Sequence, residues 1–589
     1  MSNAASINSF ETPSAAASLL NHSGRALMAN QLRAMSSFRY NLLFGHRAKG
    51  LGLPLPNLQN GTSAKAAALY RGEFNFCGKT YARNETNIFT EKAMSPDWLA
   101  RLHGFSWLAD MQAAGRELAR AQSRTLITEW IASQKLTGSP FKTDIATNSD
   151  VLARRVISWL QHAPFVLHRA PKSFSDQFFA SISQQTRSLY KRTCTEKNSL
   201  KRLQAAIAVS CASVGLSGLE GLRQRCFERL TGELNNQILA DGGHISRNPQ
   251  VLRDLLADLI PVRQALEAAR LEVPADLNAA LERMLPALRF FTYGDGGLAV
   301  FNGVNDTRAG LVRRILATDS VCGTPLSHAR HSGYIRLQQG NSTIMVDVGK
   351  PTMPTINDQA TASALAFEFS DGGTRLITNC GAIQHGDEAW SAAARSTQAH
   401  STLCIDDQPV GGILDGVLTR LACGGPVVLS APNISAELET GRQGAKFIGS
   451  QDGYKKTHGI THHRQLFLDA NGLDFRGHDS FDIDPERAGQ ALPFAIRFHL
   501  HPSVRATVSQ DGASAMLLLA NKTGWRFSAR GAQLKLEDSI YLPEDGRVRK
   551  TSQLVLRGAA GRPGKILWAF KRIEKRKGAK VETAAPQLL

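Results

Sequence analysis

The sequence predicts a helical half followed by an all-β half, with the change near residue 320–330. Between about residues 64 and 320, apolar residues recur every three or four positions, which is the period of a helix packed on one face. From about residue 330 the period falls to two, and Gly-containing turns separate short alternating runs. Many short strands joined by turns are typical of a large antiparallel β-sandwich. We therefore expect a multidomain chain in which α and β structure are segregated along the sequence.

The clearest helical segment is VLARRVISWL, residues 151–160. Its large apolar side chains fall on one stripe, at spacings of i, i+4, i+7 and i+8: Leu152, Val156, Trp159 and Leu160. The same kind of pattern predicts helices over residues 114–134, 201–219 and 251–273. In the last of these, we expect Pro261 to kink or break the helix, because proline has no backbone N–H to donate.

Three hairpins are expected in the second half, with turns at residues 339–341, 371–373 and 471–472. The last turn is Asn-Gly, which is a strong short-range signal for a hairpin. Alternating patterns over residues 524–542 and 565–574 predict further strands. The expected division is an N-terminal extension (1–63), a helical domain (64–322), a β-sandwich (323–572) and a basic tail (573–589).

The chain carries 69 Lys and Arg against 50 Asp and Glu, a formal net charge of +19. Such an excess favours a polyanionic partner: nucleic acid, an anionic membrane face or an acidic polysaccharide. Nucleic acid is not expected, because the sequence contains no RNP, zinc-finger or helix-turn-helix motif. The eight cysteines include no C-x-x-C pair, so neither a zinc ribbon nor a disulfide framework is predicted.

The sequence gives little sign of membrane insertion or secretion. It contains no apolar run long enough for a transmembrane helix, and its first residues lack a basic region followed by an apolar one. A cytoplasmic location is therefore expected. Residues 25–48 are basic and partly amphipathic, so they could make a peripheral contact with a membrane surface, although a helix packed on the helical domain is the favoured alternative. The oligomeric state is not predicted.

Residues 242–249, Gly-Gly-His-Ile-Ser-Arg-Asn-Pro, form the first candidate functional cluster. His244, Arg247 and Asn248 lie three or four positions apart, so a turn or helix could bring them to one face. Arg and Asn donate hydrogen bonds to carboxylates, and His can donate or carry a proton. The alternative interpretation is the N-terminus of a helix with its capping polar groups.

Tyr293 lies in a second cluster, on a glycine-rich loop where a tyrosine is expected to be more exposed than in a core. A plain turn with an aromatic plug is the alternative. Histidines form a third set in the β half: His400 precedes a strand, His462-His463-Arg464 opens another, and His499 and His501 share a face. A structural polar network is the alternative for this set.

Several segments, in this order, resemble the heparinase II/III-like polysaccharide lyases. DWLARLHGFSWLAD is similar to a Trp-rich segment early in that family, GGHISRNP to its neutraliser segment and FFTYGDGGLAVFNG to the following glycine-rich loop. RSTQAHSTLCID resembles a strand entry of its C-terminal domain, and residues 452–479 resemble a later Gly-Tyr … His-Arg … Gly-x-Asp stretch. The matching segments extend from about residue 95 to 502.

The resemblance implies an incomplete (α/α) toroid followed by an antiparallel β-sandwich, and β-elimination at a uronic acid of an acidic polysaccharide. This reaction needs a group that neutralises the carboxylate, a base for the α-proton and an acid for the leaving oxygen. By resemblance, His244 holds the neutraliser position, Tyr293 the base or acid position and His400 that of the sandwich histidine. The implied substrate-binding residues are Arg247, Asn248, His463 and Arg464.

Two positions depart from the family pattern. Thr361 stands where a histidine is expected, and Asn379 stands where an Asp-Pro-Gly strand end is expected. Metal-binding relatives use that histidine and aspartate as ligands, so no cofactor is predicted, and Asp347 is the remaining acidic candidate. The departures also motivate an alternative function: a non-catalytic acidic-glycan-binding or cell-envelope protein on the same scaffold. Members of the family usually act in the periplasm or cell envelope, which conflicts with the cytoplasmic expectation.

Overall fold

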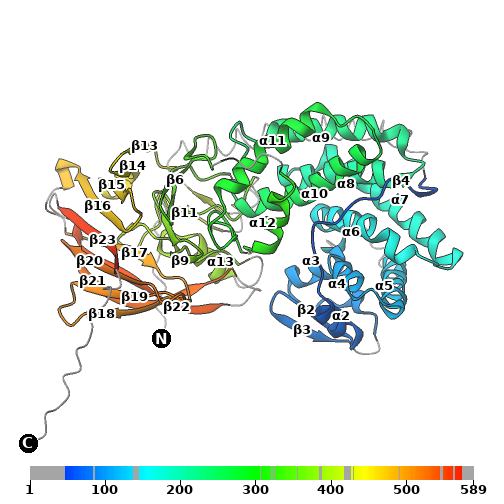
Figure 1. The fold of residues 1–589 in the computed structure, drawn as a ribbon, viewed down its shortest axis with the longest axis horizontal. Helices are drawn as coiled ribbons and strands as arrows, with labels where there is room; N and C mark the ends of the chain where they lie inside the picture. The colour runs from blue at the N-terminus through cyan, green and yellow to red at the C-terminus, as the bar shows by residue number, and fades with distance from the viewer. Residues whose placement is uncertain are drawn as a thin grey trace, which may run out of the picture.

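The computed structural model describes residues 47–573 in two joined halves, one helical and one built of strands (Figure 1). Not described within this range are residues 84–85, 137–144, 306, 320–322, 324, 354–355, 384–387, 417–418, 420–425, 429, 488, 490, 544–547 and 561–563. The predicted amphipathic segment therefore lies outside the described residues except at its last two positions, and the basic tail lies outside from residue 574. No helix among the described residues is long and apolar enough to cross a membrane.

Helices and two small strand pairs make up the first half. The helices are α2 (Ser63–Tyr70), α3 (Pro96–Gly104), α4 (Leu108–Ala114), α5 (Glu117–Leu136), α6 (Ser149–Leu167), α7 (Lys172–Thr195), α8 (Ser199–Gly215), α9 (Arg223–Gln237), α10 (Pro249–Ala268), α11 (Ala275–Phe290) and α12 (Ala309–Leu316). The strand pairs are β1 (Gly50–Leu51) with β4 (Leu216–Ser217), and β2 (Glu73–Phe76) with β3 (Lys79–Ala82). The sequence interpretation had placed no hairpin in this half, so the β2–β3 hairpin is an addition to it.

The helices form an open arc of two layers (Figure 1). Helix α8 packs against α6 and α10 and also contacts α7 and α9, while α5 contacts α7 and α9 contacts α11. Helices α6, α8 and α10 thus form the inner layer of an incomplete (α/α) toroid, as predicted. Every residue of α8 from Ala205 to Gly215 is buried. Most of these side chains are small, and this allows the neighbouring helices to pack closely around α8.

Helix α10 corrects one sequence expectation. It starts where Asn248 accepts a hydrogen bond from the Gln250 backbone N–H at 2.8 Å, with Pro249 at the first helical position. It then continues through Pro261 to Ala268, so of the two expected outcomes, a kink or a break, the break is wrong. Leu255, Leu256, Leu259 and Ile260 are all buried here, and this packing outweighs the loss of one backbone hydrogen bond.

Antiparallel sheets make up the second half. The five-stranded sheet contains β5 (His328–Ala329), β6 (Tyr334–Gln339), β7 (Ser342–Asp347), β8 (Phe367–Asp371) and β9 (Thr374–Ile377), in this order. The four-stranded sheet has the order β10 (Leu403–Ile405), β17 (Leu492–His499), β22 (Arg549–Ala560) and β21 (Gln533–Tyr541). The short strands β11 (Ile413–Leu414) and β12 (Val427–Val428) pair with each other. Helices α13 (Glu388–Arg395) and α15 (Lys455–His458) lie between strands in the sequence.

The largest sheet has eight strands. Their spatial order is β13 (Ile434–Gly441), β14 (Gly444–Tyr454), β15 (Ile460–Asp469), β16 (Asp474–Ile483), β23 (Lys565–Ile573), β20 (Gly524–Arg530), β19 (Ser514–Leu518) and β18 (Arg505–Val508). One face of this sheet packs on the core of the second half through alternate residues such as Trp525, Phe527, Trp568 and Phe570. This aromatic layer stacks against Phe367 of the five-stranded sheet, whose ring centroid lies 5.5 Å from that of Trp568.

The strand registers confirm the three predicted hairpins. Gln339 pairs with Ser342, Asp371 with Thr374 and Leu468 with Phe475, which places each turn at the expected residues. The turn glycine Gly472 has a φ of 70°, a conformation that residues with a side chain rarely adopt. The predicted class, α structure followed by an antiparallel sandwich, is therefore confirmed.

Candidate functional site

The segment 242–248 lies at the junction of the two halves and is held by close backbone contacts. A Cβ atom on Gly242, whose φ is 81°, would come within 1.9 Å of the Arg283 carbonyl oxygen. A Cβ atom on Gly243 would come within 1.9 Å of Ser332 Oγ. Ser332 belongs to the sandwich half and donates to Asp241 from both its backbone N–H (2.7 Å) and its hydroxyl (2.8 Å). The two glycines therefore allow the toroid backbone to approach its neighbours.

His244 is buried, and protein groups occupy both of its ring nitrogens. Its Nδ1 accepts from the Ser246 backbone N–H at 3.0 Å and lies 2.7 Å from Ser246 Oγ. Its Nε2 lies 3.0 Å from Gln237 Oε1, so the proton of the neutral ring is on Nε2. Burial lowers the pKa of His244 to about 3, and the imidazole is therefore uncharged at neutral pH.

Arg247 joins the toroid to the sandwich, and it is a buried side chain in which every guanidinium nitrogen donates to a protein oxygen. Its guanidinium donates to the carbonyl oxygens of Ser332 (2.8 Å), Gly333 (3.1 Å) and Lys350 (3.0 Å), and to the Asp347 carboxylate. It also lies over the Tyr334 ring, 4.8 Å from the centroid. This arrangement does not agree with the predicted substrate-binding role of Arg247, because the guanidinium is buried and bonded to oxygen atoms of the protein.

Asp347 is the centre of this network, which we call the Arg247 clamp: Arg247, Asn302, Tyr334, Asp347, Thr361 and Ser363. Besides Arg247, Asp347 accepts from Ser363 Oγ at 2.7 Å. Thr361 Oγ1 lies 2.7 Å from Ser363 Oγ and 3.3 Å from Asn302 Oδ1. Thr361, where the resemblance led us to expect a histidine, thus serves as a link in a buried hydrogen-bond network.

Tyr293 lies in a second buried group, with Glu368, Arg375 and Asn379, which we call the Glu368 cluster. The Arg375 guanidinium lies over the Tyr293 ring, 5.0 Å from its centroid. The Glu368 carboxylate accepts from the backbone N–H groups of Asn379 (3.0 Å) and Val300 (2.9 Å). The Tyr293 hydroxyl makes no hydrogen bond with the described residues. Burial and the nearby Glu368 charge hold its pKa well above the usual range, so the group is a neutral phenol.

The glycine-rich loop around Tyr293 serves packing. A Cβ atom on Gly294 would lie 2.2 Å from the Gly372 carbonyl oxygen, and one on Gly297 would lie 2.6 Å from the Arg375 guanidinium. The loop therefore docks closely on the β8–β9 turn. The expectation that a tyrosine on this loop is exposed is wrong, because Tyr293 is 3% exposed.

His400 is buried on the sandwich side of the junction. Its Nδ1 lies 2.8 Å from the Ser396 carbonyl oxygen. Burial lowers the pKa of His400 to about 4, against the opposing influence of that carbonyl and of the Asp347 charge. Among the described residues, no hydrogen bond or ring contact joins His244, Tyr293 and His400 to one another.

The comparisons with known proteins decide the family. The profile of the heparinase II/III-like C-terminal domain matches residues 322–575. The crystal structure of heparinase III superposes with a TM-score of 0.68 at 15% identity, covering 94% of this chain and 91% of that one. FtsZ-localized protein C of Caulobacter vibrioides (strain NA1000 / CB15N) is 31% identical over 495 residues, which are 82% of this chain and 84% of that protein. The chain is a member of the heparinase II/III-like family.

Heparan sulfate lyase HepC from Pedobacter heparinus shares the heparinase II/III-like fold with this chain. Its structure superposes with a TM-score of 0.54 at 15% identity, over 87% of this chain and 83% of that chain. At these identities the solved structures show the fold alone. The chain thus has the scaffold of the heparinase II/III-like polysaccharide lyases, as the sequence resemblance implied.

The other predicted binding residues also have internal partners. Asn248 caps α10 with its side-chain oxygen, as the helix-capping alternative expected. His463 and Arg464 are neighbours on β15, so their side chains point to opposite faces of the sheet and cannot face one ligand. Arg464 is buried and donates to Asp479 Oδ1 at 2.7 Å, whereas His463 lies on the outer face, 2.7 Å from Asp482 Oδ2.

The sequence predicts no metal cofactor in this heparinase II/III-like chain because of the residues at two positions, Thr361 and Asn379. Asn379 Nδ2 donates to the Val300 carbonyl oxygen at 2.9 Å, and its Oδ1 accepts from the Ser401 N–H at 3.1 Å. Thr361 and Asn379 thus make hydrogen bonds within the scaffold at the two positions where the resemblance led us to expect metal ligands, and a hydroxyl and an amide already bonded to protein groups do not fit a zinc ion. Within the described residues, no group of three His, Cys, Asp or Glu side chains could hold a metal ion.

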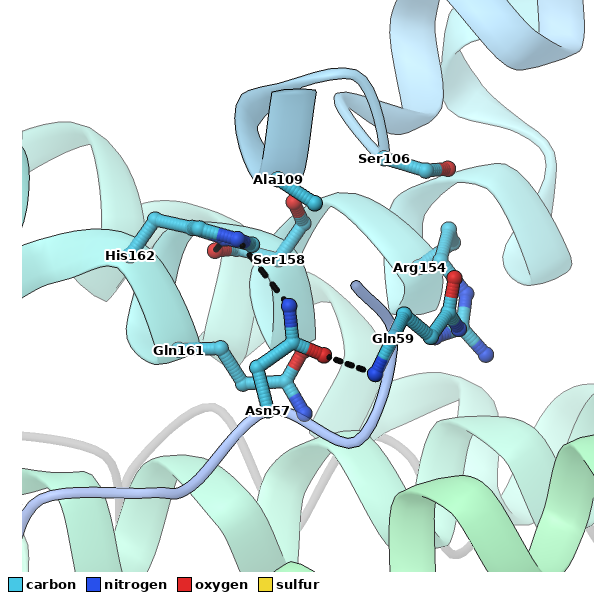
Figure 2. Close-up of a pocket in the computed structure, with 8 residues that line it drawn as sticks. All are labelled: Asn57, Gln59, Ser106, Ala109, Arg154, Ser158, Gln161 and His162. Carbon is cyan, nitrogen blue, oxygen red and sulfur yellow. Dashed lines mark hydrogen bonds between the residues drawn. The ribbon is translucent and has the colours of Figure 1, made fainter. Parts of the chain in front are cut away.

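Two cavities in the helical half have no candidate catalytic residue in their walls. One lies between α5, α6 and α7, has a volume of about 470 Å³ and is lined by residues such as Gln134, Gln177 and Arg192. The other measures about 10 Å³, room for about one water molecule (Figure 2). In Figure 2, two of the lining residues are hydrogen-bonded to each other, since Asn57 Nδ2 lies 3.2 Å from His162 Nε2.

Several residues of the junction had not been singled out as functional from the sequence. Tyr334, Glu368 and Arg375 are buried charged or polar groups on strands of the five-stranded sheet. Each lies inside an alternating strand pattern, next to large apolar residues. A polar residue at an inward position of such a strand is the signal that could have identified them.

Proposed function

We propose that this protein is a non-catalytic member of its family that uses the lyase scaffold for binding at the site of FtsZ assembly. One observation supports the first part of this proposal, that the protein is not catalytic. The three side chains that the family resemblance assigns to catalysis, His244, Tyr293 and His400, are at most 3% exposed and face protein groups.

The chemistry of β-elimination supports this conclusion. A base must come within hydrogen-bond reach of the substrate proton, and a neutralising group must contact the carboxylate. His244 has both ring nitrogens occupied, and the Arg247 guanidinium is surrounded by four protein oxygens. The phenol of Tyr293 has a raised pKa, which makes it a poor base at neutral pH. Catalysis would require the junction to open and several buried hydrogen bonds to break.

The second part of the proposal comes from a named relative described above. That protein is called FtsZ-localized protein C, and its 31% identity extends over 82% of this chain. We infer that this chain likewise localizes with FtsZ, and therefore on the cytoplasmic side of the membrane. This location agrees with the cytoplasmic expectation from the sequence.

A fluorescent fusion expressed in Caulobacter vibrioides, the organism of that relative, tests the localization. We expect a band that coincides with FtsZ and disperses when FtsZ is depleted. The double variant His244→Ala/Tyr293→Phe, if it folds as judged by circular dichroism, is expected to localize equally well. Uniform fluorescence of the folded wild-type fusion in cells with intact FtsZ bands would overturn this part of the proposal.

A lyase acting on a uronic-acid polysaccharide is the second candidate. The similarity to heparinase III over 94% of the chain favours it. This candidate requires an unsaturated, ultraviolet-absorbing product whose formation stops in both His244→Ala and Tyr293→Phe. The basic net charge of +19 is compatible with either candidate.

A further inference from the structure

Strand β13 forms one edge of the eight-stranded sheet, and its only paired neighbour among the described strands is β14. All residues from Ile434 to Gly441 pair with β14 in an unbroken register. The strand contains no proline, lysine, arginine or bulge, which are features that usually protect an exposed edge. The opposite edge strand, β18, has only 4 residues, begins with Arg505 and contacts β21 of the four-stranded sheet. Strand β13 is therefore the less protected edge of the two.

The backbone groups that β13 turns away from β14 follow from the register. The Asp452 N–H donates to the Asn433 carbonyl oxygen at 3.3 Å, so Asn433 and every second residue after it bond to β14. The residues between them turn their N–H and C=O groups outward: Ile434, Ala436, Leu438 and Thr440. Within the described part of the chain, none of these outward groups makes a hydrogen bond. They extend over about 20 Å of strand.

The side chains of three of these residues form an incompletely covered margin of the sandwich core. Ile434, Ala436 and Leu438 pack against the core but are only partly buried. Side chains alternate between the two faces of a sheet, so an added strand would place every second side chain over this row. Apolar residues at those positions would bury the surface that is still exposed.

The outer face of β13 is acidic. Glu437 and Glu439 point away from the core and are exposed. Glu439 lies 3.5 Å from Lys446 on β14, whereas Glu437 lies opposite Ile448 and forms no ion pair with a described residue. Opposite charges on neighbouring strands stabilise their pairing, so a cation on an added strand would fit opposite Glu437.

A second copy of this chain fits the edge poorly. Glu437 lies near the middle of β13, so antiparallel pairing of two copies about this point would place two glutamates opposite each other. Like charges in these positions destabilise a sheet. A uronate polymer or an anionic lipid surface has the wrong charge, and neither has backbone groups at the spacing of a strand.

We propose that β13 binds an extended segment of a protein partner by strand addition, with apolar side chains over Ile434, Ala436 and Leu438 and a lysine or arginine opposite Glu437. In this mode of recognition, main-chain hydrogen bonds supply affinity and alternate side chains supply specificity. The partner segment therefore alternates apolar and basic residues over about seven positions, the length of the free edge. This binding mode does not depend on localization with FtsZ.

Two isomeric peptides test the strand addition by fluorescence anisotropy. Both are short labelled peptides of alternating Lys and Val. One is N-methylated on its valine amides, which would face β13, and the other on its lysine amides, which would face away. We expect the full-length protein to bind the lysine-methylated isomer at least about tenfold more tightly. Only this isomer keeps the donors for the Ala436 and Leu438 carbonyl oxygens, while charge and composition are the same in both.

Two variants and a matched control localize the site. Ala436→Pro removes an outward N–H without removing a bond to β14, and Glu437→Lys reverses the unpaired charge. Each should weaken binding of the lysine-methylated isomer by about tenfold. Glu228→Lys, at an exposed position of α9, makes the same change of charge and should leave binding unchanged. Both lysine variants should unfold at the wild-type temperature, so Glu437→Lys decides the matter if Ala436→Pro does not fold.

Three results would contradict strand addition at β13. The first is equal binding of the two isomers, or binding of neither, since the outward backbone groups would then have no part in recognition. The second is unchanged binding in Glu437→Lys. The third is a concentration-dependent dimer of the wild-type protein that Ala436→Pro abolishes, because a second copy would then be the occupant of the edge.

Discussion

Replacing Arg247 with alanine is expected to lower the free energy of unfolding by about 3–5 kcal/mol, the range found when one partner of a buried ion pair is removed. The variant leaves the Asp347 carboxylate buried without its cation, and it takes one hydrogen-bond donor from each of the carbonyl oxygens of Ser332, Gly333 and Lys350. These oxygens belong to the sandwich, whereas Arg247 precedes a toroid helix. The interactions lost in this variant are therefore those that hold the two halves together.

Chemical denaturation followed by circular dichroism measures this effect. Arg530→Ala, which removes an exposed arginine on β20, is the matched control and should change stability by less than about 0.5 kcal/mol. The double variant Arg247→Met/Asp347→Leu should be more stable than Arg247→Ala, because no charge is then left buried without a partner. If Arg247→Ala is as stable as Arg530→Ala, the guanidinium does not hold the junction, and a role toward a ligand regains support.

Replacing Asp479 with asparagine is expected to have an effect of similar size, about 3–5 kcal/mol, within the sandwich. Asp479 accepts hydrogen bonds from Arg464 Nε (2.7 Å) and Trp568 Nε1 (2.8 Å), and its Oδ1 lies 2.7 Å from His462 Nε2. Asparagine keeps the shape but removes the charge, so the buried Arg464 guanidinium loses its counter-ion. Asp482→Asn, at the exposed partner of His463, is the control with a small expected effect.

The pH dependence of stability gives an independent check on Asp479. Burial alone would raise the pKa of this carboxyl, but the Arg464 charge and the hydrogen bond with His462 outweigh burial and hold the pKa well below its usual range. A carboxyl with a lowered pKa in the folded state contributes stability above its unfolded pKa of about 3.9, and this contribution disappears as the pH falls toward the folded value. Wild-type protein should therefore lose stability below about pH 4 more steeply than Asp479→Asn. Parallel pH profiles for the two proteins would contradict this role.

The order of structure along the chain could be predicted from residue periodicity, because local patterns determine it. The turn at Asn471-Gly472 and the helical stripe of VLARRVISWL depend only on neighbouring residues. Strand order could not be predicted in the same way. Strand β23 pairs with β16 and β20, whose residues are far away in the sequence, and no local pattern specifies such partners.

For the same reason, the side-chain partners within the candidate site could not be predicted from the sequence. The sequence located the segments of the junction, since Arg247, Tyr293, Thr361 and His400 all lie there. It could not show that Asp347 and three carbonyl oxygens occupy the Arg247 guanidinium, because those partners lie about a hundred residues away. The opposite orientation of His463 and Arg464, by contrast, could be predicted from the sequence. Adjacent residues on a strand face opposite ways, and the alternating pattern had already placed them on a strand.

The non-catalytic assignment is tested most directly by a lyase assay with the folded wild-type protein. The protein is incubated with heparin, heparan sulfate, hyaluronan, chondroitin sulfate and alginate, and the ultraviolet absorbance of unsaturated uronate ends is followed, with heparinase III as the positive control on heparan sulfate. The account predicts no increase above that of the His244→Ala/Tyr293→Phe variant on any polymer. A steady increase on one polymer that is absent in this variant would contradict it, and would show that the junction opens to admit substrate.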